Sequence, residues 1–332
     1  MSALPAFTLQ RPASLAEAAA LLALPHARLL AGGTDLLANL RRGLEQPHTL
    51  IDLSIVPGLD AVDADADGGL VLGARVTLAQ LAADARLDGG AWRALAEAAR
   101  EVAAPQHRSA ATVGGNLCLD TRCVFYNQSA WWRAANDHCL KRGGDTCHVA
   151  PQGARCHAAF SGDLAPALIA LGAEVELVSS QATRRIALAA LYRDDGAAHL
   201  TLATGELLAR VHVPPAAPGT ASGYRKARVR GSIDFPLAGV AIALRMDGPR
   251  IAALHVALTG TNAHPLVLEG TEALVGREVD AALLGALAKL VGKQVSPMRT
   301  TATPSNYRRQ VAGVLAQRLL RELAGVPAGE RA

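Results

Sequence analysis

The sequence predicts an α+β protein, with a two-part α/β domain followed by a smaller domain of antiparallel strands and helices. Two observations carry this prediction. In the first part, strand-like and helix-like segments alternate, which is typical of α/β units. Beyond a proline- and glycine-rich connector at residues 214–219, three strand-like segments follow one another and two helical segments end the chain. This connector is the predicted boundary between domains over residues 1–215 and 220–325.

The first subdomain is predicted to cover residues 1–55. Ser14 and Glu17 fit a capping box, in which the hydroxyl and the carboxylate bind free N–H groups at the start of a helix. The expected elements are a helix that ends near Pro25, a strand over residues 28–31, a helix through Leu36 and Leu40, and a strand over residues 50–53. Their order predicts an α/β unit.

The second subdomain is predicted to cover residues 56–215. Its expected elements are a strand over residues 70–72, a helix capped by Thr77, an Ala-rich helix over residues 91–102, a helix over residues 164–171 and a strand over residues 174–178. Between these elements, residues 118–159 form an insert that is too long for an ordinary connection. Loops of this length usually carry function or a bound centre.

The C-terminal domain is predicted from three apolar segments over residues 224–228, 237–246 and 250–259. The last two are separated by Asp247-Gly248, a turn signal that predicts an antiparallel hairpin. Two helices are expected over residues 281–291 and 306–323.

Composition narrows the function classes. Half of the 332 residues are hydrophobic, 3% are aromatic and the formal charge is +4, without a basic stripe of the kind that binds nucleic acid. No apolar run approaches the length of about 18–20 residues that a membrane span needs, and the N-terminus lacks a signal-like segment. We therefore expect a cytoplasmic protein, in which thiols stay reduced.

The cysteines are clustered. Four of the five lie in the insert, at Cys123, Cys139, Cys147 and Cys156. Thiolates gathered in a loop are what an iron–sulfur cluster or a structural zinc requires, although this spacing lacks the tight C-x2-C pairs of many such sites. The spacing favours a metal centre and leaves unpaired thiols or disulfides open.

Two glycine turns could hold a nucleotide. Gly32-Gly33-Thr34-Asp35 stands between a predicted strand and a helix, and Thr112-Val113-Gly114-Gly115-Asn116 precedes the insert. Glycine allows a close backbone approach, and N–H groups at a helix start favour an anion. Neither turn matches the Rossmann or P-loop motif, and each alone could be an ordinary tight turn. Together, in one α/β chain, they favour a shared dinucleotide.

These turns carry a family resemblance. The segments 29–36 and 111–117, followed by Tyr224-x-Lys226 with Asp234 downstream, resemble the FAD-binding medium subunits of the xanthine oxidase (molybdenum hydroxylase) family. The resemblance implies a PCMH-type FAD-binding domain and a CO dehydrogenase flavoprotein-like C-terminal domain. It assigns FAD contacts to Leu29, Leu30, Ala31, Gly32, Gly33, Thr34, Asp35, Leu36, Val102, Thr112, Val113, Gly114, Gly115, Asn116 and Lys226.

The insert resembles that of the β subunit of 4-hydroxybenzoyl-CoA reductases, which carries an additional 4Fe–4S cluster. This resemblance implies that Cys123, Cys139, Cys147 and Cys156 are the cluster ligands. It also implies electron transfer from reduced ferredoxin toward molybdenum, for the reductive dehydroxylation of 4-hydroxybenzoyl-CoA to benzoyl-CoA. The alternative within the family is the medium subunit of an aldehyde or N-heterocycle oxidoreductase. The implied partners are a large molybdopterin subunit and a small subunit with two 2Fe–2S clusters, in a dimer of heterotrimers.

Several of these residues also have simpler interpretations. Asp163 precedes a predicted helix and is most simply its N-cap. Lys226 could be a surface lysine, although on a strand it would share a face with Tyr224. Cys118 is expected to be a buried thiol behind the second glycine turn rather than a ligand, and the role of Asp120 is left open. Trp131 and Trp132 could shield the cluster, contact another subunit or pack within the loop.

No Ser/His/Asp set or carboxylate pair stands out in the sequence. We therefore assign no residue that transforms a substrate, and the chain is interpreted as an electron relay. A zinc-stabilised binding protein without redox chemistry is the hypothesis from another class.

Overall fold

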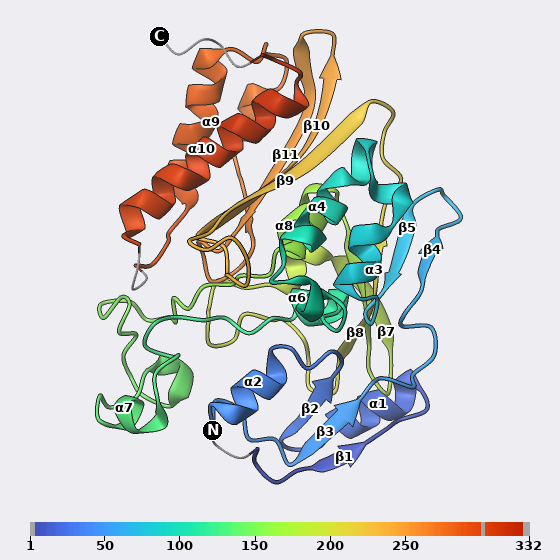
Figure 1. Ribbon diagram of the computed structural model, residues 1–332, viewed down its shortest axis with the longest axis vertical. Coiled ribbons are helices and arrows are strands. Elements are labelled where there is room, and N and C mark those ends of the chain that lie inside the picture. Colours follow the sequence, from blue (N-terminus) through green and yellow to red (C-terminus); the bar gives the residue numbers. More distant parts are fainter. Residues whose placement is uncertain (1–3, 300–302, 328–332) are drawn as a thin grey trace.

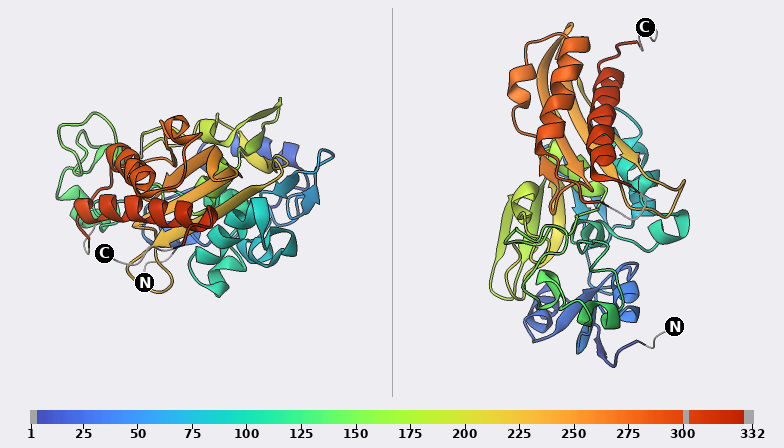
Figure 2. Two further views of the ribbon diagram at one scale, coloured as in Figure 1. Left: turned by 90° about the horizontal axis from the view of Figure 1, so that it is seen from above. Right: turned by 90° about the vertical axis from the view of Figure 1, so that its left-hand side faces the viewer.

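The computed structural model describes residues 4–299 and 303–327. The molecule is elongated, with the N-terminal subdomain at one end and the two last helices at the other (Figures 1 and 2). Three separate sheets, of three, five and four strands, follow one another along its length. This mixture of helices and predominantly antiparallel sheets confirms the predicted α+β class.

The N-terminal subdomain contains a small parallel sheet in the order β1-β3-β2. Its elements are β1 (Thr8–Gln10), α1 (Leu15–Leu22), β2 (Ala27–Leu30), α2 (Leu36–Arg41) and β3 (Thr49–Asp52). Helix α1 begins as predicted, because the Ser14 hydroxyl accepts a hydrogen bond from the N–H of Glu17 at 3.2 Å. The Glu17 carboxylate differs from the prediction, since it accepts from the N–H of Ala13, one residue earlier, at 2.7 Å.

The second subdomain is built on a five-stranded antiparallel sheet in the order β4-β5-β8-β6-β7. Its strands are β4 (Val62–Ala64), β5 (Leu70–Gly73), β6 (Glu174–Val178), β7 (Thr183–Ala187) and β8 (Leu207–Val213). Strand β8 lies at the centre of the sheet, although it was not predicted. It pairs with β5 from before the insert and with β6 from after it, so the two halves of the subdomain close into one unit.

Short helices connect this sheet to the rest of the molecule. They are α3 (Leu78–Ala83), α4 (Arg93–Glu101), α5 (Pro105–Arg108), α6 (Val113–Leu117) and α8 (Leu164–Ala170), with 3₁₀ turns at Ala85–Leu87, Gly90–Trp92 and Leu188–Leu191. Helix α3 begins with the predicted cap at Thr77, which forms a complete capping box with Gln80. Helices α4 and α8 are rich in buried alanine and leucine, and small side chains allow them to approach neighbouring elements closely.

The C-terminal domain is a four-stranded antiparallel sheet with two helices. Its elements are β9 (Thr220–Ala227), β10 (Ala238–Asp247), β11 (Arg250–Thr259), β12 (Leu266–Val267), a 3₁₀ turn at Thr271–Leu274, α9 (Ala281–Gln294) and α10 (Ser305–Leu323). The predicted hairpin between β10 and β11 is confirmed.

Strand β10 is apolar on both faces because both faces of its sheet are covered. Val240, Ile242 and Leu244 pack in a core with α9 and α10. The alternate residues Ala241 and Ala243 pack in a core that contains α4 and α8. Successive side chains of a strand point to opposite faces, so the C-terminal sheet is covered on both sides (Figure 1).

The insert contains little regular structure. Its elements are the helix α7 (Ala130–Ala134) and a 3₁₀ turn at Leu140–Arg142, and it projects from the side of the molecule near α2 (Figure 1). The Arg122 side chain, which is 8% exposed, anchors the first residues of the insert, because its guanidinium binds Asp35 at 2.9 Å and also Asn39. Across residues 4–299 and 303–327, no helix has the length and apolar character to cross a bilayer.

Candidate functional site

A cleft of about 1670 Å³ separates the N-terminal subdomain from the second subdomain. The first glycine turn forms one wall and the second glycine turn forms another. The lining also includes residues 118–120 at the start of the insert, residues 197–200 and 202–208 before and within β8, and residues 233–235 of the C-terminal domain. The cleft exceeds the volume of an ordinary ligand pocket, which is about 300–1,000 Å³, and suits an extended dinucleotide.

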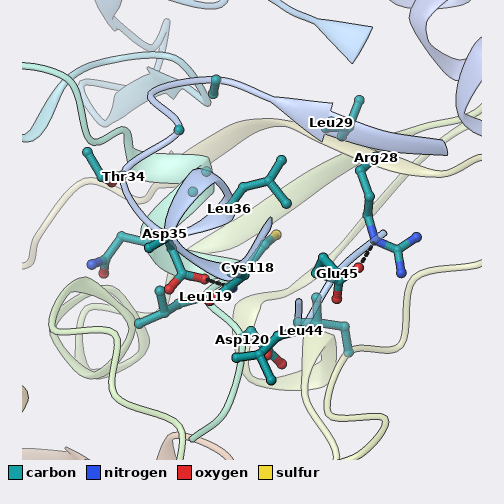
Figure 3. A pocket seen from close by; sticks show the side chains of 18 of the residues that line it. Arg28, Leu29, Thr34, Asp35, Leu36, Leu44, Glu45, Cys118, Leu119 and Asp120 are labelled. Atoms are coloured by element: carbon teal, nitrogen blue, oxygen red, sulfur yellow. Dashed lines mark hydrogen bonds and ion pairs between the residues drawn. The ribbon is translucent and has the colours of Figure 1, made fainter. Parts of the chain in front are cut away.

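The first glycine turn, with Thr34 and Asp35, lies on this cleft (Figure 3) and presents unpaired backbone donors to it. Gly33 has a φ of +68°, in the left-handed region that glycine tolerates. Within the described part of the chain, the N–H groups of Gly32, Gly33 and Thr34 donate no hydrogen bond. Successive free N–H groups in a turn are the usual cradle for a phosphate.

The second glycine turn has a different role from the one expected. Most of its N–H groups are already paired: Val113 donates to Val76, Gly114 to Ala74 and Gly115 to the Thr112 hydroxyl. Among the described residues, only the N–H of Thr112 in this turn has no acceptor. The turn therefore contributes close approach more than free donors. A Cβ at Gly114 would lie 2.9 Å from the Cβ of Ala74, so only glycine fits against the strand end behind it.

The first turn packs against the chain just ahead of the second turn. A Cβ at Gly32 would lie 1.9 Å from the carbonyl oxygen of Ala110 and 2.5 Å from its carbonyl carbon. Backbone atoms at these distances cannot move aside as a side chain could. Gly32 is therefore required because it lets the N-terminal subdomain contact the chain just ahead of the second turn.

Most of the predicted FAD residues line the cleft. The lining includes Leu29, Ala31, Gly32, Gly33, Thr34, Asp35, Leu36, Val102, Thr112, Gly114, Gly115 and Asn116. Three predicted residues, Leu30, Val113 and Lys226, are not part of that lining. Val113 is fully buried in the hydrophobic core.

Lys226 is buried behind the cleft instead of facing it or the surface. Its Nζ lies 2.9 Å from the Asp163 carboxylate, and the two side chains are 1% and 4% exposed. The Tyr224 hydroxyl donates to the other Asp163 oxygen at 2.5 Å, which confirms that Tyr224 and Lys226 share a face of β9. Asp163 lines the cleft and thus links this buried pair to the site.

The interpretation of Asp163 as a helix cap is wrong. Its side chain makes no capping hydrogen bond to α8, because both carboxylate oxygens are used by Tyr224 and Lys226. The Asn116 side chain of the second glycine turn takes that role, and its Oδ1 accepts from the N–H of Leu164 at 3.0 Å. Asn116 therefore joins the second turn to the start of α8.

Two histidines in the cleft lining are not predicted from the sequence. The Nε2 atom of His199 and the Nδ1 atom of His107 are buried and have no hydrogen-bond partner among the described residues. Burial, together with the charge of Lys141, lowers the pKa of His199 to about 4. A neutral imidazole can accept or donate a hydrogen bond. No local motif marks either residue; only the fold brings them to the cleft.

The four cysteines of the insert surround a second, smaller cavity. Cys123, Cys139, Cys147 and Cys156 line it together with Phe125, Tyr126, Leu140, Lys141, His148 and Val149. All four are free thiols, so the structure contains no disulfide between them. Within the described residues, no three His, Cys, Asp or Glu side chains are spaced to hold a single metal ion.

The donor chemistry of this cavity suits a cluster held by thiolates. No carboxylate lines it. The N–H of Tyr126 donates to the Cys123 sulfur at 3.2 Å and that of Ala158 to the Cys156 sulfur at 3.4 Å. N–H donors of this kind stabilise and tune thiolate-bound clusters. Without a metal, burial raises the pKa of the Cys156 thiol to about 11, so a metal would be needed to keep it ionised.

Cys118 and the tryptophans lie away from this cavity. Cys118 follows the second glycine turn and lines the FAD-sized cleft (Figure 3), where burial raises the pKa of its thiol to about 12. Trp131 on α7 is strongly exposed, and the Trp132 ring lies 6.1 Å from the Phe125 ring. Trp132 therefore packs within the insert, and Trp131 does not.

Comparison with known proteins places this geometry in a family. Residues 5–216 match the FAD binding domain in molybdopterin dehydrogenase, and residues 222–323 match the CO dehydrogenase flavoprotein C-terminal domain. The chain is an FAD-binding subunit of the molybdenum hydroxylase family. It therefore consists of a PCMH-type FAD-binding domain and a CO dehydrogenase flavoprotein C-terminal domain, and it is an oxidoreductase subunit.

Relatives with known names span almost the whole chain. The aldehyde oxidoreductase FAD-binding subunit PaoB of Escherichia coli is 35% identical over 83% of this chain and 88% of its own. The carbon monoxide dehydrogenase medium chain of Afipia carboxidovorans is 28% identical over 94% of each chain. A crystal structure of Cu,Mo-CO dehydrogenase matches with a TM-score of 0.80 at 26% identity, covering 98% of this chain and 100% of that chain.

Proposed function

We propose that this chain is an electron-transfer subunit that carries FAD in the large cleft and a 4Fe–4S cluster on the four cysteines of the insert. The observation that carries the proposal is the pair of adjoining cavities, one lined by both glycine turns and one by all four thiols. A flavin exchanges one or two electrons when bound, and a cluster passes them singly.

The residues of the first turn would hold the diphosphate of FAD. The N–H groups of Gly32, Gly33 and Thr34 are free to donate to phosphate oxygens, and such donors need no counter-cation. The unpartnered ring nitrogens of His107 and His199 could satisfy polar atoms of the nucleotide or the flavin ring. No group in the cleft is proposed to transform a substrate, in agreement with the relay role.

The cysteines would hold the cluster as thiolates. Lys141 and His148 also line this cavity, and a nearby cation offsets the negative charge of a four-thiolate cubane. The cluster assignment rests on this donor set and on the resemblance of the insert to that of 4-hydroxybenzoyl-CoA reductases.

Replacing any one of the four insert cysteines should remove the cluster and leave the flavin. The expected result for Cys139→Ala is iron near zero and loss of the EPR signal of the reduced cluster, with the flavin-to-protein ratio unchanged. Cys118→Ala is the matched control, because Cys118 lies in the other cavity, and it should keep its iron. Full iron content in Cys139→Ala would contradict the ligand assignment.

The complex is proposed to contain a large molybdopterin subunit and a small subunit with two 2Fe–2S clusters, arranged as a dimer of heterotrimers in the cytoplasm. Two relatives are likewise named as medium chains of carbon monoxide dehydrogenases. The substrate would react on the large subunit.

Two substrate classes compete. The similarity to PaoB, an aldehyde oxidoreductase subunit, favours an aldehyde, whose oxidation sends electrons from molybdenum through this chain and out at the flavin. The cysteine insert resembles that of a 4-hydroxybenzoyl-CoA reductase, in which reduced ferredoxin would supply electrons in the opposite direction. We propose aldehyde oxidation as the main activity and dehydroxylation of 4-hydroxybenzoyl-CoA as the second candidate.

Purified complex should distinguish the two substrates. We expect reduction of an artificial electron acceptor when aromatic aldehydes are added, and no formation of benzoyl-CoA from 4-hydroxybenzoyl-CoA with a reduced low-potential donor. The reverse result would establish the second candidate and reverse the assigned direction of electron flow.

A further inference from the structure

The large cleft and the cysteine cavity share a wall. Tyr126 and Lys141 line both of them, and no other described residue does so. The backbone N–H of Tyr126 donates to the Cys123 sulfur at 3.2 Å, and Tyr126 is also part of the cleft lining. Any charge held in this wall acts on the occupants of both cavities.

Lys141 holds a fixed positive charge in this wall. Its side chain is 8% exposed, and its Nζ donates to Asp120 Oδ1 at 2.6 Å and to the carbonyl oxygens of Thr121 and Gly196 at 2.9 and 3.0 Å. The ammonium also lies 4.6 Å from the centroid of the Tyr126 ring. With this many contacts, the position of the charge is set by the fold rather than by side-chain motion.

Asp120 places the opposite charge next to it. One carboxylate oxygen binds Lys141, and the other accepts from the Tyr126 hydroxyl at 3.1 Å. Asp120 lines the cleft beside Cys118 and Leu119 (Figure 3), and its side chain is 24% exposed. The wall therefore contains a nearly neutral ion pair, and removing either member would leave a net charge between the two cavities.

We propose that Lys141 and Asp120 are positioning residues that set the reduction potentials of the flavin and the cluster together. The inference rests on the proposed function. Reduction adds negative charge, so a nearby cation stabilises the reduced form and a nearby anion destabilises it. Such effects are stronger away from bulk water, and local charge is one of the factors that set cluster potentials. The pair thus sets both potentials through one shared balance of charge.

The test compares two nearly isosteric variants that leave opposite charges. Lys141→Met should lower the midpoint potentials of both groups, and Asp120→Asn should raise both. The flavin is followed by its visible absorbance and the cluster by EPR at a series of fixed potentials. We expect shifts on the order of tenfold in each one-electron equilibrium, which is about 59 mV. Lys141→Arg should restore values near those of the wild type.

Lys289→Met removes an exposed lysine of α9 and should shift neither potential. Shifts of the same sign in the two main variants would indicate a structural disturbance and overturn the proposal, as would a shift in one cofactor alone or in neither. Iron analysis of the wild-type chain separates this failure from that of the proposed function: a chain without iron overturns both, whereas an iron-containing chain with unchanged potentials overturns only the role of the pair. If Lys141→Met loses iron, the Asp120→Asn variant still decides the outcome.

Discussion

Gly32→Ala is expected to destabilise the protein by about 1–3 kcal/mol and to abolish FAD binding. The added Cβ would lie 1.9 Å from the Ala110 carbonyl oxygen. Because that atom belongs to the backbone, the contact can be relieved only by moving the N-terminal subdomain away from the second glycine turn. This movement would separate the walls of the cleft. Urea unfolding and the flavin-to-protein ratio of the purified chain measure the two effects.

Gly285→Ala is the matched control for this substitution. Gly285 lies inside α9, and its added Cβ would meet nothing within 4 Å. Alanine is favoured over glycine in a helix by about 0.5–1 kcal/mol, so this variant should be slightly more stable and should keep its flavin. A Gly32→Ala variant that behaved like this control would show that the two turns do not form one site.

Lys226→Met is expected to cost about 3–5 kcal/mol, because it leaves the Asp163 carboxylate buried without its cation. The two side chains are almost fully buried, so water cannot replace the lost partner. Only the Tyr224 hydroxyl would still bind Asp163. The free energy of unfolding, measured by urea denaturation, tests the expected loss.

The loss of stability in Lys226→Met should depend on pH. Burial raises the pKa of Asp163, and the Lys226 charge opposes this rise; without Lys226 the pKa of Asp163 rises further. Because the pKa of Asp163 is raised in the folded state, the protonated acid favours folding. This contribution is complete below the unfolded pKa of about 3.9, and it is lost as pH rises through the folded pKa. The variant should therefore be closer to the wild type at about pH 5 than at about pH 8.

A second substitution separates charge from packing. Adding Asp163→Asn to Lys226→Met removes the buried charge and should recover part of the lost stability, since the effects of contacting residues are not additive. The double variant should also lose the dependence on pH. A difference of less than about 0.5 kcal/mol between the free energies of unfolding of Lys226→Met and the wild type is typical of a surface position. If the difference stays that small at every pH, Lys226 and Asp163 do not form the buried ion pair that the structure shows.

Local signals in the sequence were enough to predict most helices and strands. The Thr77 cap, the turn at Asp247-Gly248 and the boundaries of β6 and β11 follow from residues within a few positions of one another. Strand β8 was missed although its residues are largely apolar, because its position depends on pairing with β5, more than 130 residues earlier. Pairing at that separation leaves no local pattern to detect.

The candidate site also has features that the sequence shows and features that only the folded chain shows. Both glycine turns and the cysteine cluster are visible as residue types at short spacing, and the fold places the turns on one cleft and the thiols on one cavity. The sequence could not show that the first turn keeps three successive free N–H groups while most of those in the second turn are paired. It also gave no sign of His199, whose ring nitrogen matters only because folding buries it.

Residue identity and local order were enough to predict the α+β class, the family resemblance and the set of residues with cofactor chemistry. Which of these groups meet became visible only in the folded chain: Asp163 binds Lys226 instead of capping α8, and Lys141 lies between the two cavities. Burial and ion pairing depend on neighbours in space, and those neighbours come from segments far apart in the chain.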